Sequence, residues 1–365
     1  MKKYLQDFHI YESDQKISQE KAVNWLVDYQ ATNDTPLYEK YAVKPEHIST
    51  RMILASGISE NSDSQNPLFS LKKLNNPLLE ERSEAAQLKI EEIFDFLYNE
   101  NEIAPDFLNH VSCTHYQSPS AAQKLVLDKS WNSQTTVTHL YHMGCYAALP
   151  AIRVSKAYVA DGAQQVDIVH TELCSFHLNQ GHTSPEQIIT NTLFSDGALK
   201  YSVTSGDFFD LQKRDGLEIL AQKEVLVQGS ENEMSWKLSS QGFLMTLTKK
   251  VPVYIARGIE DFMESIFADA GIDYGRHKHK TIFAIHPGGP KIIDWIAKTL
   301  DLNFSQIEHS SKILKTRGNM SSATIPHIWN EILEDKNIAK GTIIATVAFG
   351  PGLTMTGAVL KLCRF

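Results

Sequence analysis

The sequence lacks a long uninterrupted apolar segment. A helix that spans a bilayer needs about 18 apolar residues in a row, and the longest apolar stretch, residues 341–353, is interrupted by glycine and proline. The first residues, MKKYLQDFHIYESDQ, contain lysines but no apolar run behind them. We therefore expect neither a secretory signal peptide nor a membrane span, and a cytoplasmic location.

Cysteine and clustered cations are also scarce. The 4 cysteines, at positions 113, 145, 174 and 363, have no close paired spacing, so we expect free thiols. Lys plus Arg total 35 against 43 for Asp plus Glu, a formal charge of -8. Because a nucleic-acid interface needs clustered cations, this balance argues against one. The 365 residues suffice for two packed halves of ordinary domain size.

Helix and strand patterns alternate along the chain. Residues 18–30 predict an amphipathic helix with Ser18 as its N-cap. Residues 79–99 predict another, whose apolar stripe consists of Leu88, Ile90, Ile93, Phe94 and Leu97. Further helices are expected over 260–270 and 290–300, and strands over 107–113, 164–173, 281–285, 342–349 and 354–362. This alternation predicts an α/β fold, with a boundary between halves in the polar stretch 205–216.

Cys145 follows Gly144 at a predicted strand-to-helix turn, in HLYHMGCYAALPAIRVSKAYV. Proline is tolerated in the first turn of a helix, so Pro150 predicts a helix that begins near Leu149, with Cys145 in the preceding turn. Backbone N–H groups and the helix dipole favour a thiolate there, which indicates a nucleophile. The structural alternative is a small buried core residue.

His286 and Asn319 lie in two further glycine-containing segments. His286 ends an apolar strand and precedes Pro-Gly-Gly-Pro, where Pro290 suits the first turn of a helix. An imidazole at a strand end suits acid–base chemistry or donation to an oxyanion, with a structural histidine as the alternative. Asn319, in GNMSSA before an apolar helix, fits either an N-cap or a carboxamide donor to a developing negative oxygen.

These segments occur in a characteristic order: the Cys145 turn, HPGGP (286–290), GNMSSA (318–323) and FGPGLT (349–354). In this order they resemble the catalytic motifs of the type III polyketide synthases of the chalcone/stilbene synthase superfamily. LFSDGA (193–198) is a further similar segment, and similar stretches run from about residue 51 to the end. The segment HYQSPSAAQKL lacks the dimer-loop sequence of the plant enzymes, which favours a bacterial-type member.

The resemblance implies a fold and three catalytic roles. The family has the thiolase fold, two similar halves in α-β-α-β-α layers, and forms homodimers; the halves would be residues 1–210, with the cysteine, and 211–365, with histidine and asparagine. Cys145 would be the nucleophile that accepts an acyl group from a thioester. His286 and Asn319 would bind the thioester oxygen during malonyl decarboxylation, and His286 would help to keep Cys145 as a thiolate. No acid lies in these motif cores, and no cofactor is expected beyond the CoA thioester substrates.

The resemblance also implies pocket positions. Phe194 would lie at the gate between entry tunnel and cavity, and Met245 at a second gate where plant members usually have an aromatic residue. Other cavity-lining positions would be Thr114, His115, Cys174, His177, Trp236 and Ser321. Core packing is the alternative for Phe194, Met245 and Trp236. We expect Met245 to admit an aliphatic chain, Trp236 to cap the cavity, and His177 and Cys174 to alter cyclisation.

Fewer residues in the sequence indicate how the acyl donor binds. Lys44 and Arg51 lie where plant enzymes place cations for the CoA phosphates, but the cluster is thinner. Acyl-CoA and malonyl-CoA are the expected substrates, and an acyl carrier protein is an alternative donor. Two other functions remain open: a single-condensation ketosynthase that depends on a carrier protein, and a catalytically silent partner subunit.

Metal and protease functions fit the sequence poorly. His139, His142 and Cys145, and the pair His277 and His279, lack the four closely paired ligands of structural zinc, so no metal is expected. GRHKHK (275–280) is interpreted as a solvated loop. A papain-like hydrolase also uses cysteine, histidine and asparagine, but its local cysteine signature is absent from the sequence.

Overall fold

The computed structural model describes residues 1–30, 35–58, 67–71, 76–99, 103–179, 184–240 and 242–365. The helices are α1 (Gln19–Gln30), α2 (Thr35–Tyr41), α3 (Leu79–Leu97), α4 (Ala121–Asp128), α5 (Ala148–Ala160), α6 (Pro185–Leu193), α7 (Gly206–Gln212), α8 (Val251–Asp269), α9 (Tyr274–His277), α10 (Pro290–Thr299), α11 (Phe304–Arg317) and α12 (Thr324–Glu334), with 3-10 turns η1 (Cys174–His177), η2 (Lys278–Lys280) and η3 (Ser321–Ala323). The strands are β1 (Lys3–Ile10), β2 (Lys16–Ser18), β3 (Thr50–Met52), β4 (Phe107–Ser112), β5 (Thr136–Tyr141), β6 (Gln165–Glu172), β7 (Gly197–Ser205), β8 (Gly216–Leu226), β9 (Met234–Ser239), β10 (Gly242–Leu247), β11 (Ile282–Ile285), β12 (Ile343–Gly350) and β13 (Thr354–Cys363).

The main strands form a mixed sheet in the order β11-β12-β13-β8-β1-β7-β6-β4-β5. Strands β11 and β12 are parallel, as are β4 with β5 and β4 with β6, whereas the remaining pairs are antiparallel. Among the strands of the described residues, a short pairing of β1 with β8, Tyr4 with Glu218 and Leu5 with Leu217, joins the two sides of the sheet. The sheet therefore consists of two sections that meet at this pairing.

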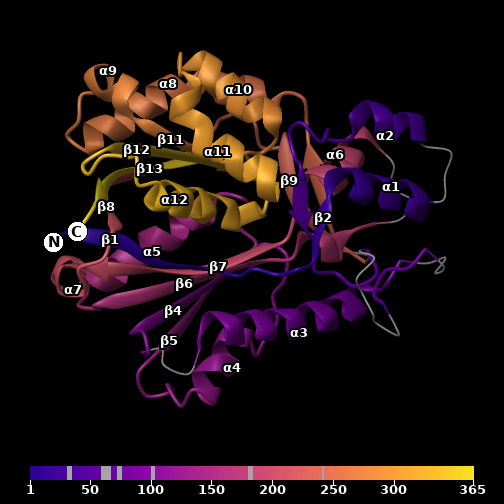
Figure 1. The fold of residues 1–365 in the computed structure, drawn as a ribbon, viewed down its shortest axis with the longest axis horizontal. Helices are drawn as coiled ribbons and strands as arrows, with labels where there is room; N and C mark the ends of the chain where they lie inside the picture. Colours follow the sequence, from indigo (N-terminus) through magenta and orange to yellow (C-terminus); the bar gives the residue numbers. More distant parts are fainter. Residues whose placement is uncertain (31–34, 59–66, 72–75, 100–102, 180–183, 241) are drawn as a thin grey trace.

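Helices cover both sections and fill the space between them (Figure 1). Helix α5 contacts β4, β6, β7 and β13, and α12 contacts β7 and β11, so these two helices pack between the sections. Helix α8 covers β8 and β13 on one outer face and carries α10, while α3 and α4 cover the other. This is the α-β-α-β-α arrangement that the resemblance implied, and it agrees with the α/β layering predicted from the alternating pattern.

Apolar side chains of α5 and α12 make the central layer. Ile152 and Ile328 are fully buried, and Trp329 donates its indole N–H to Thr346 Oγ1 at 2.8 Å. Burying these side chains removes apolar area from water and holds the two sections together. The segments that precede α5 and α12 carry Cys145 and Asn319, so this packing also fixes the backbone of both candidate residues.

Most predicted elements are present with shifted ends. Ser18 Oγ accepts the N–H of Lys21 at 3.3 Å, as expected of an N-cap. Two predictions are wrong. Leu88 is 69% exposed and does not belong to the buried stripe of α3, and residues 275–280 form parts of α9 and η2 rather than a loop. In addition, α8 begins at Val251, well before residue 260.

The hairpin of β9 and β10 was not predicted from the sequence. Its strands pair with each other in a separate two-stranded sheet, with Trp236 opposite Met245. The hairpin lies beside α6 and η1. Met234, Trp236, Phe243 and Met245 of the hairpin line a cavity that also contains Cys145.

Within the described residues, no helix is both long and apolar enough to cross a bilayer.

Candidate active site

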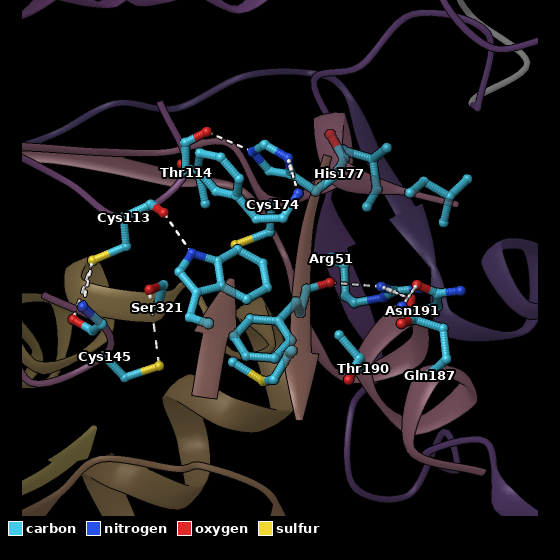
Figure 2. A pocket seen from close by; sticks show the side chains of 18 of the residues that line it. Arg51, Cys113, Thr114, Cys145, Cys174, His177, Gln187, Thr190, Asn191 and Ser321 are labelled. Carbon is cyan, nitrogen blue, oxygen red and sulfur yellow. Dashed lines mark hydrogen bonds between the residues drawn. The ribbon is translucent and has the colours of Figure 1, made fainter. Parts of the chain in front are cut away.

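A cavity of about 60 Å³ lies where the two halves meet the β9–β10 hairpin. Figure 2 shows Cys145 and Ser321 on one side of it and Arg51, Gln187 and Asn191 on the other. All of the predicted pocket positions line it except His115: Thr114, Cys174, His177, Phe194, Trp236, Met245 and Ser321. Because these residues come from distant segments, tertiary packing alone brings them together.

Cys145 lies in the turn that precedes α5, as the sequence predicted. The helix begins at Ala148, and Pro150 falls within its first turn. The side chain is 8% exposed, and its sulfur contacts Ser321 Oγ at 3.8 Å. The turn directs the sulfur into the cavity.

Gly144 allows this turn. Its φ is +93°, and a Cβ added there would lie 2.4 Å from Cδ of Pro351. Glycine adopts a positive φ without steric cost, whereas other residues pay for it. The glycine before the cysteine is therefore required both by backbone conformation and by close packing.

We expect Gly144→Ala to destabilise the fold and displace Cys145. Gly162→Ala is the matched control, because Gly162 also has a positive φ, +113°, but no atom within 4 Å of an added Cβ. The control carries only the backbone strain, about 1–2 kcal/mol, and Gly144→Ala adds the clash with Pro351. Urea unfolding of both variants measures the difference, and equal losses of stability would show that the contact with Pro351 is unimportant.

The cysteine is a neutral thiol in its present surroundings. Burial raises the pKa of Cys145 to about 12, the charge of Glu172 acts in the same direction, and the hydrogen bond with Ser321 opposes both. This differs from the expectation that the turn favours a thiolate. Desolvation outweighs the backbone groups of the turn because no cation lies beside the sulfur among the described residues.

His286 directly follows β11, at the predicted strand end. Its backbone N–H donates to the carbonyl of Val347 at 2.9 Å, which extends the pairing with β12. The side chain is 1% exposed, and neither ring nitrogen has a hydrogen-bond partner among the described residues. Burial lowers the pKa of His286 to about 3, so the imidazole is neutral. A buried polar group without a partner costs stability, which suggests that the imidazole serves a ligand.

Asn319 is held by its backbone and by one side of its carboxamide. Its N–H donates to the carbonyl of Leu193 at 3.0 Å, and its carbonyl accepts the N–H of Ser195 at 2.9 Å. Its Oδ1 accepts the N–H of Ser321 at 2.9 Å. It is not the N-cap of α12, which begins at Thr324. Because Oδ1 is occupied, Nδ2 is the group of this carboxamide that remains for a ligand.

The Cys145 turn contacts GNMSSA at Ser321 and FGPGLT at Pro351. The Ser321 hydroxyl contacts the Cys145 sulfur, and its N–H binds Asn319. Strand β12, the partner of the strand before His286, ends at Gly350, where an added Cβ would lie 2.0 Å from the ring of Tyr146. Among the described residues no hydrogen bond joins Cys145 directly to His286 or Asn319. Ser321 links Cys145 to Asn319, whereas neither His286 nor Asn319 is among the described residues that line the cavity.

Glu172 is a buried acid beside the site that sequence reasoning missed. It accepts hydrogen bonds from the N–H and hydroxyl groups around it, namely the N–H of Cys113 at 3.1 Å, the hydroxyl of Thr114 at 3.1 Å and that of Ser322. Burial raises the pKa of Glu172 to about 7. The motif cores contain no acid, yet the fold places this one against GNMSSA. The sequence feature that could have indicated Glu172 is a glutamate at the end of a predicted buried strand rich in β-branched residues.

The two predicted CoA-binding cations lie in different surroundings. Lys44 is half-buried and donates to the carbonyl of Glu39, and its role stays a prediction. Arg51 is 2% exposed, lines the cavity and donates Nη1 to the carbonyls of Asn191 and Phe194 at 2.8 and 2.6 Å. Burial lowers the pKa of Arg51 to about 10, which leaves it charged. In this position Arg51 is better placed to hold the segment around Phe194 than to contact a CoA phosphate.

The hairpin closes the cavity opposite Cys145. Trp236 donates Nε1 to the carbonyl of Cys113 at 2.7 Å, and His142 Nε2 donates to the carbonyl of Trp236 at 3.0 Å. His177 donates Nε2 to the carbonyl of Thr114 and accepts the N–H of Phe243 at Nδ1, which fixes its tautomer. Burial lowers the pKa of His177 to about 3. His177 is therefore a neutral wall residue.

Comparison with known proteins agrees with these features. The family model for FAE1/type III polyketide synthase-like proteins matches residues 1–214, and the model for the C-terminal domain of chalcone and stilbene synthases matches residues 218–363. Together these models match nearly the whole chain.

Individual relatives are distant. The chain is 26% identical to "Probable polyketide synthase 1" of Dictyostelium discoideum over 69% of its length, which is 8% of that protein. It is 27% identical to 1,3,6,8-tetrahydroxynaphthalene synthase of Streptomyces griseus over 70% of its length and 66% of that enzyme. The crystal structure of a tetrahydroxynaphthalene synthase from Streptomyces coelicolor, a bacterial type III polyketide synthase, superposes with a TM-score of 0.82 at 20% identity, covering 99% of this chain and 100% of that one.

The structural likeness confirms the predicted thiolase-like fold, and the family models confirm the resemblance seen in the motifs. The division at residue 210 and the roles of the individual site residues stay predictions. The chain belongs to the type III polyketide synthase family of the chalcone and stilbene synthases, as a bacterial-type member.

Proposed function

We propose that the protein catalyses decarboxylative condensation of malonyl-CoA onto an acyl group carried by Cys145. The observation that supports this most directly is the sulfur of Cys145 in the wall of a cavity, beside the Ser321–Asn319 link. A thiol exchanges readily with a thioester once it loses its proton. His286 is neutral and has no side-chain partner among the described residues, and we propose that it accepts this proton as an ion pair with the thiolate, because burial disfavours each charged group by itself.

Loading transfers an acyl group from a donor thioester to the enzyme. The Cys145 sulfur forms a bond to the thioester carbonyl carbon while its proton passes to His286. The carbon–sulfur bond to the donor breaks, and CoA leaves as a thiol with the proton that His286 held. His286 is then neutral again for the next step.

Extension breaks a carbon–carbon bond of malonyl-CoA and releases CO2. The electron pair moves to the thioester oxygen, and hydrogen-bond donors on that oxygen stabilise the enolate. Asn319 Nδ2 is one such donor, and a neutral His286 is the other. The enolate carbon then attacks the acyl carbonyl on Cys145, the carbon–sulfur bond breaks, and the sulfur leaves as a thiolate that takes up a proton from solvent to restore the thiol.

We further propose that extension is repeated and that the product cyclises to a pyrone or resorcinol. No organic cofactor or metal is needed for this chemistry, because CoA thioesters carry the reactive groups. We expect a homodimer, as in the family. The largely apolar lining of the cavity favours this function because it places few water-binding groups beside a reactive β-keto chain.

Incubation with a panel of acyl-CoAs and malonyl-CoA, followed by mass spectrometry, tests the proposal. Cyclised products of several extensions support it. The absence of CO2 release from malonyl-CoA, together with no alkylation of Cys145 by iodoacetamide, would instead indicate a silent partner subunit.

A single condensation with a carrier-protein donor is the second candidate. The burial of Arg51 favours it, because this leaves Lys44 as the remaining predicted contact for the CoA phosphates. One linear β-keto product, formed faster from acyl carrier protein than from acyl-CoA, would identify this function.

We expect Trp236→Gly to change the products. The indole lines the cavity and is fixed by its bond to the carbonyl of Cys113, so its removal lengthens the space available to the growing chain. Chromatography with mass spectrometry should show longer or differently cyclised products. Trp295→Gly, which removes a 46% exposed indole on α10, is the control. An unchanged profile in Trp236→Gly would contradict a capping role.

A further inference from the structure

Three strands of the main sheet end side by side next to the candidate active site. Strand β4 pairs in parallel with β5 on one side and with β6 on the other, so the chain leaves all three strands at the same edge of the sheet. Gly144 follows β5, Cys113 follows β4, and Glu172 ends β6. The middle one of these residues, Cys113, is a buried thiol to which the proposed mechanism gives no role.

The sulfur of Cys113 bonds both backbone polar groups of Gly144. The N–H of Gly144 donates to this sulfur at 3.0 Å, and the thiol donates to the carbonyl of Gly144 at 3.2 Å. Burial raises the pKa of Cys113 well above its usual value, so the thiol keeps the proton that it donates. In the described part of the chain, no other acceptor is bonded to the N–H of Gly144.

Cys113 is itself fixed by its backbone. Its N–H donates to Oε2 of Glu172 at 3.1 Å, and its carbonyl accepts Nε1–H of Trp236 at 2.7 Å. The residue is 1% exposed, and Figure 2 shows it beside Cys145. Because both backbone groups of Cys113 are bonded and its side chain is buried, the position of its sulfur is well defined.

The carbonyl that Cys113 binds belongs to the same peptide unit as the N–H of Cys145. This unit is trans and planar, so its C=O and N–H point in opposite directions. The bond from Cys113 to the carbonyl therefore sets the direction of the N–H of Cys145. Burial raises the pKa of Cys145 to about 12, whereas the Ser321 hydroxyl and the N–H of Cys145 itself lower it. The direction of this N–H thus affects how readily Cys145 loses its proton.

We propose that Cys113 is a positioning residue for acyl loading, whose thiol holds the Gly144–Cys145 peptide unit with the N–H of Cys145 towards the nucleophilic sulfur. This inference rests on the proposed function and adds a residue to it. The thiolate of Cys145 then meets a hydrogen-bond donor that is already in place, and a hydrogen bond to the charged form favours that form. Without the Cys113 thiol, the N–H of Gly144 loses its acceptor and the peptide unit loses its support.

Cys113→Ala is expected to slow acylation of Cys145 by acyl-CoA about tenfold, the effect of losing one hydrogen bond that favours a charged group. Release of CO2 from malonyl-CoA, for which His286 and Asn319 are the proposed donors, should stay close to the parent rate. Mass spectrometry of the intact protein measures acylation, and labelled malonyl-CoA measures CO2 release. Cys363→Ala is the matched control for loss of a thiol, since Cys363 ends β13 and does not line the cavity.

Two further measurements separate positioning from packing. The hydroxyl in Cys113→Ser donates and accepts as the thiol does, so this variant should recover most of the acylation rate that Cys113→Ala loses. The rate at which iodoacetamide alkylates Cys145, followed by peptide mass spectrometry, should rise at higher pH in Cys113→Ala than in the parent. A thiol that only fills space would leave this pH profile unchanged.

The outcomes separate this inference from the proposed function. Unchanged acylation in Cys113→Ala, or equal losses of acylation and CO2 release, overturns the positioning role. If the parent shows neither acylation nor CO2 release, the proposed function fails, but the alkylation profiles still test the inference, and identical profiles overturn it. Should Cys113→Ala not fold, Cys113→Val fills the space of the sulfur without making a hydrogen bond, and the same outcomes apply.

Discussion

Cys145→Ala is expected to abolish product formation, with a loss of at least about a thousandfold. Removing a catalytic nucleophile costs this much or more in enzymes that form a covalent intermediate. The Ser321 hydroxyl, 3.8 Å from the sulfur, does not replace it, because an alcohol is a far weaker nucleophile towards a thioester. Mass spectrometry of the intact protein after incubation with acyl-CoA measures loading directly.

The same variant distinguishes the two half-reactions. Release of CO2 from malonyl-CoA should persist in Cys145→Ala, because His286 and Asn319 are still present. Cys363→Ser is the control for loss of a thiol elsewhere, since Cys363 lies at the end of β13 and does not line the cavity. Product formation by Cys145→Ala at more than a tenth of the parent rate would remove Cys145 from the mechanism.

The sequence predicted the parts of the site that local motifs define. The glycine before Cys145, the strand end at His286 and the helix after GNMSSA each have local backbone requirements, and the structure places them as expected. Buried strands such as β6 were also recognisable, because β-branched runs suit a sheet that is covered on both faces. The layered fold followed from their alternation with amphipathic helices.

What the sequence did not predict depends on distant partners. Arg51 was predicted to contact the CoA phosphates, and its burial was not foreseen because its carbonyl acceptors, on Asn191 and Phe194, lie far away in the chain. The pKa of Cys145 depends on burial by other segments rather than on its own turn. Leu88 fits the helical period of α3, yet periodicity does not say where the covered stripe ends. In each case tertiary packing decided the outcome.

The position of His115 was likewise hidden from sequence reasoning. His115 was assigned to the active-site pocket, but it lines a second cavity beside α3. Neighbouring residues in a loop point in different directions, so Thr114 lines both cavities and His115 only one. Motif alignment assigns a position to a site, whereas the direction of a side chain is a property of the folded backbone.

Asn319→Ala should reduce malonyl decarboxylation by about 100- to 1000-fold, the usual cost of losing one oxyanion donor. Starter loading should fall much less, because the attack of the sulfur does not require the enolate to be stabilised. Release of labelled CO2 from malonyl-CoA and acylation of Cys145 by acyl-CoA measure the two half-reactions separately. Equal losses in both would contradict this division of roles.

The alanine variant also removes Oδ1, which accepts the N–H of Ser321, so it alone does not separate the donor from the support of the loop. Asn319→Asp keeps an oxygen for this N–H but replaces the Nδ2 donor with a second carboxylate oxygen. If Nδ2 stabilises the enolate, decarboxylation is lost in Asn319→Asp as well, since a negative charge beside the developing oxyanion opposes it. If instead the loop contact with Ser321 is what matters, Asn319→Asp should decarboxylate much faster than Asn319→Ala. The relative decarboxylation rates of Asn319→Asp and Asn319→Ala therefore show whether Nδ2 or Oδ1 of Asn319 is the group that decarboxylation requires.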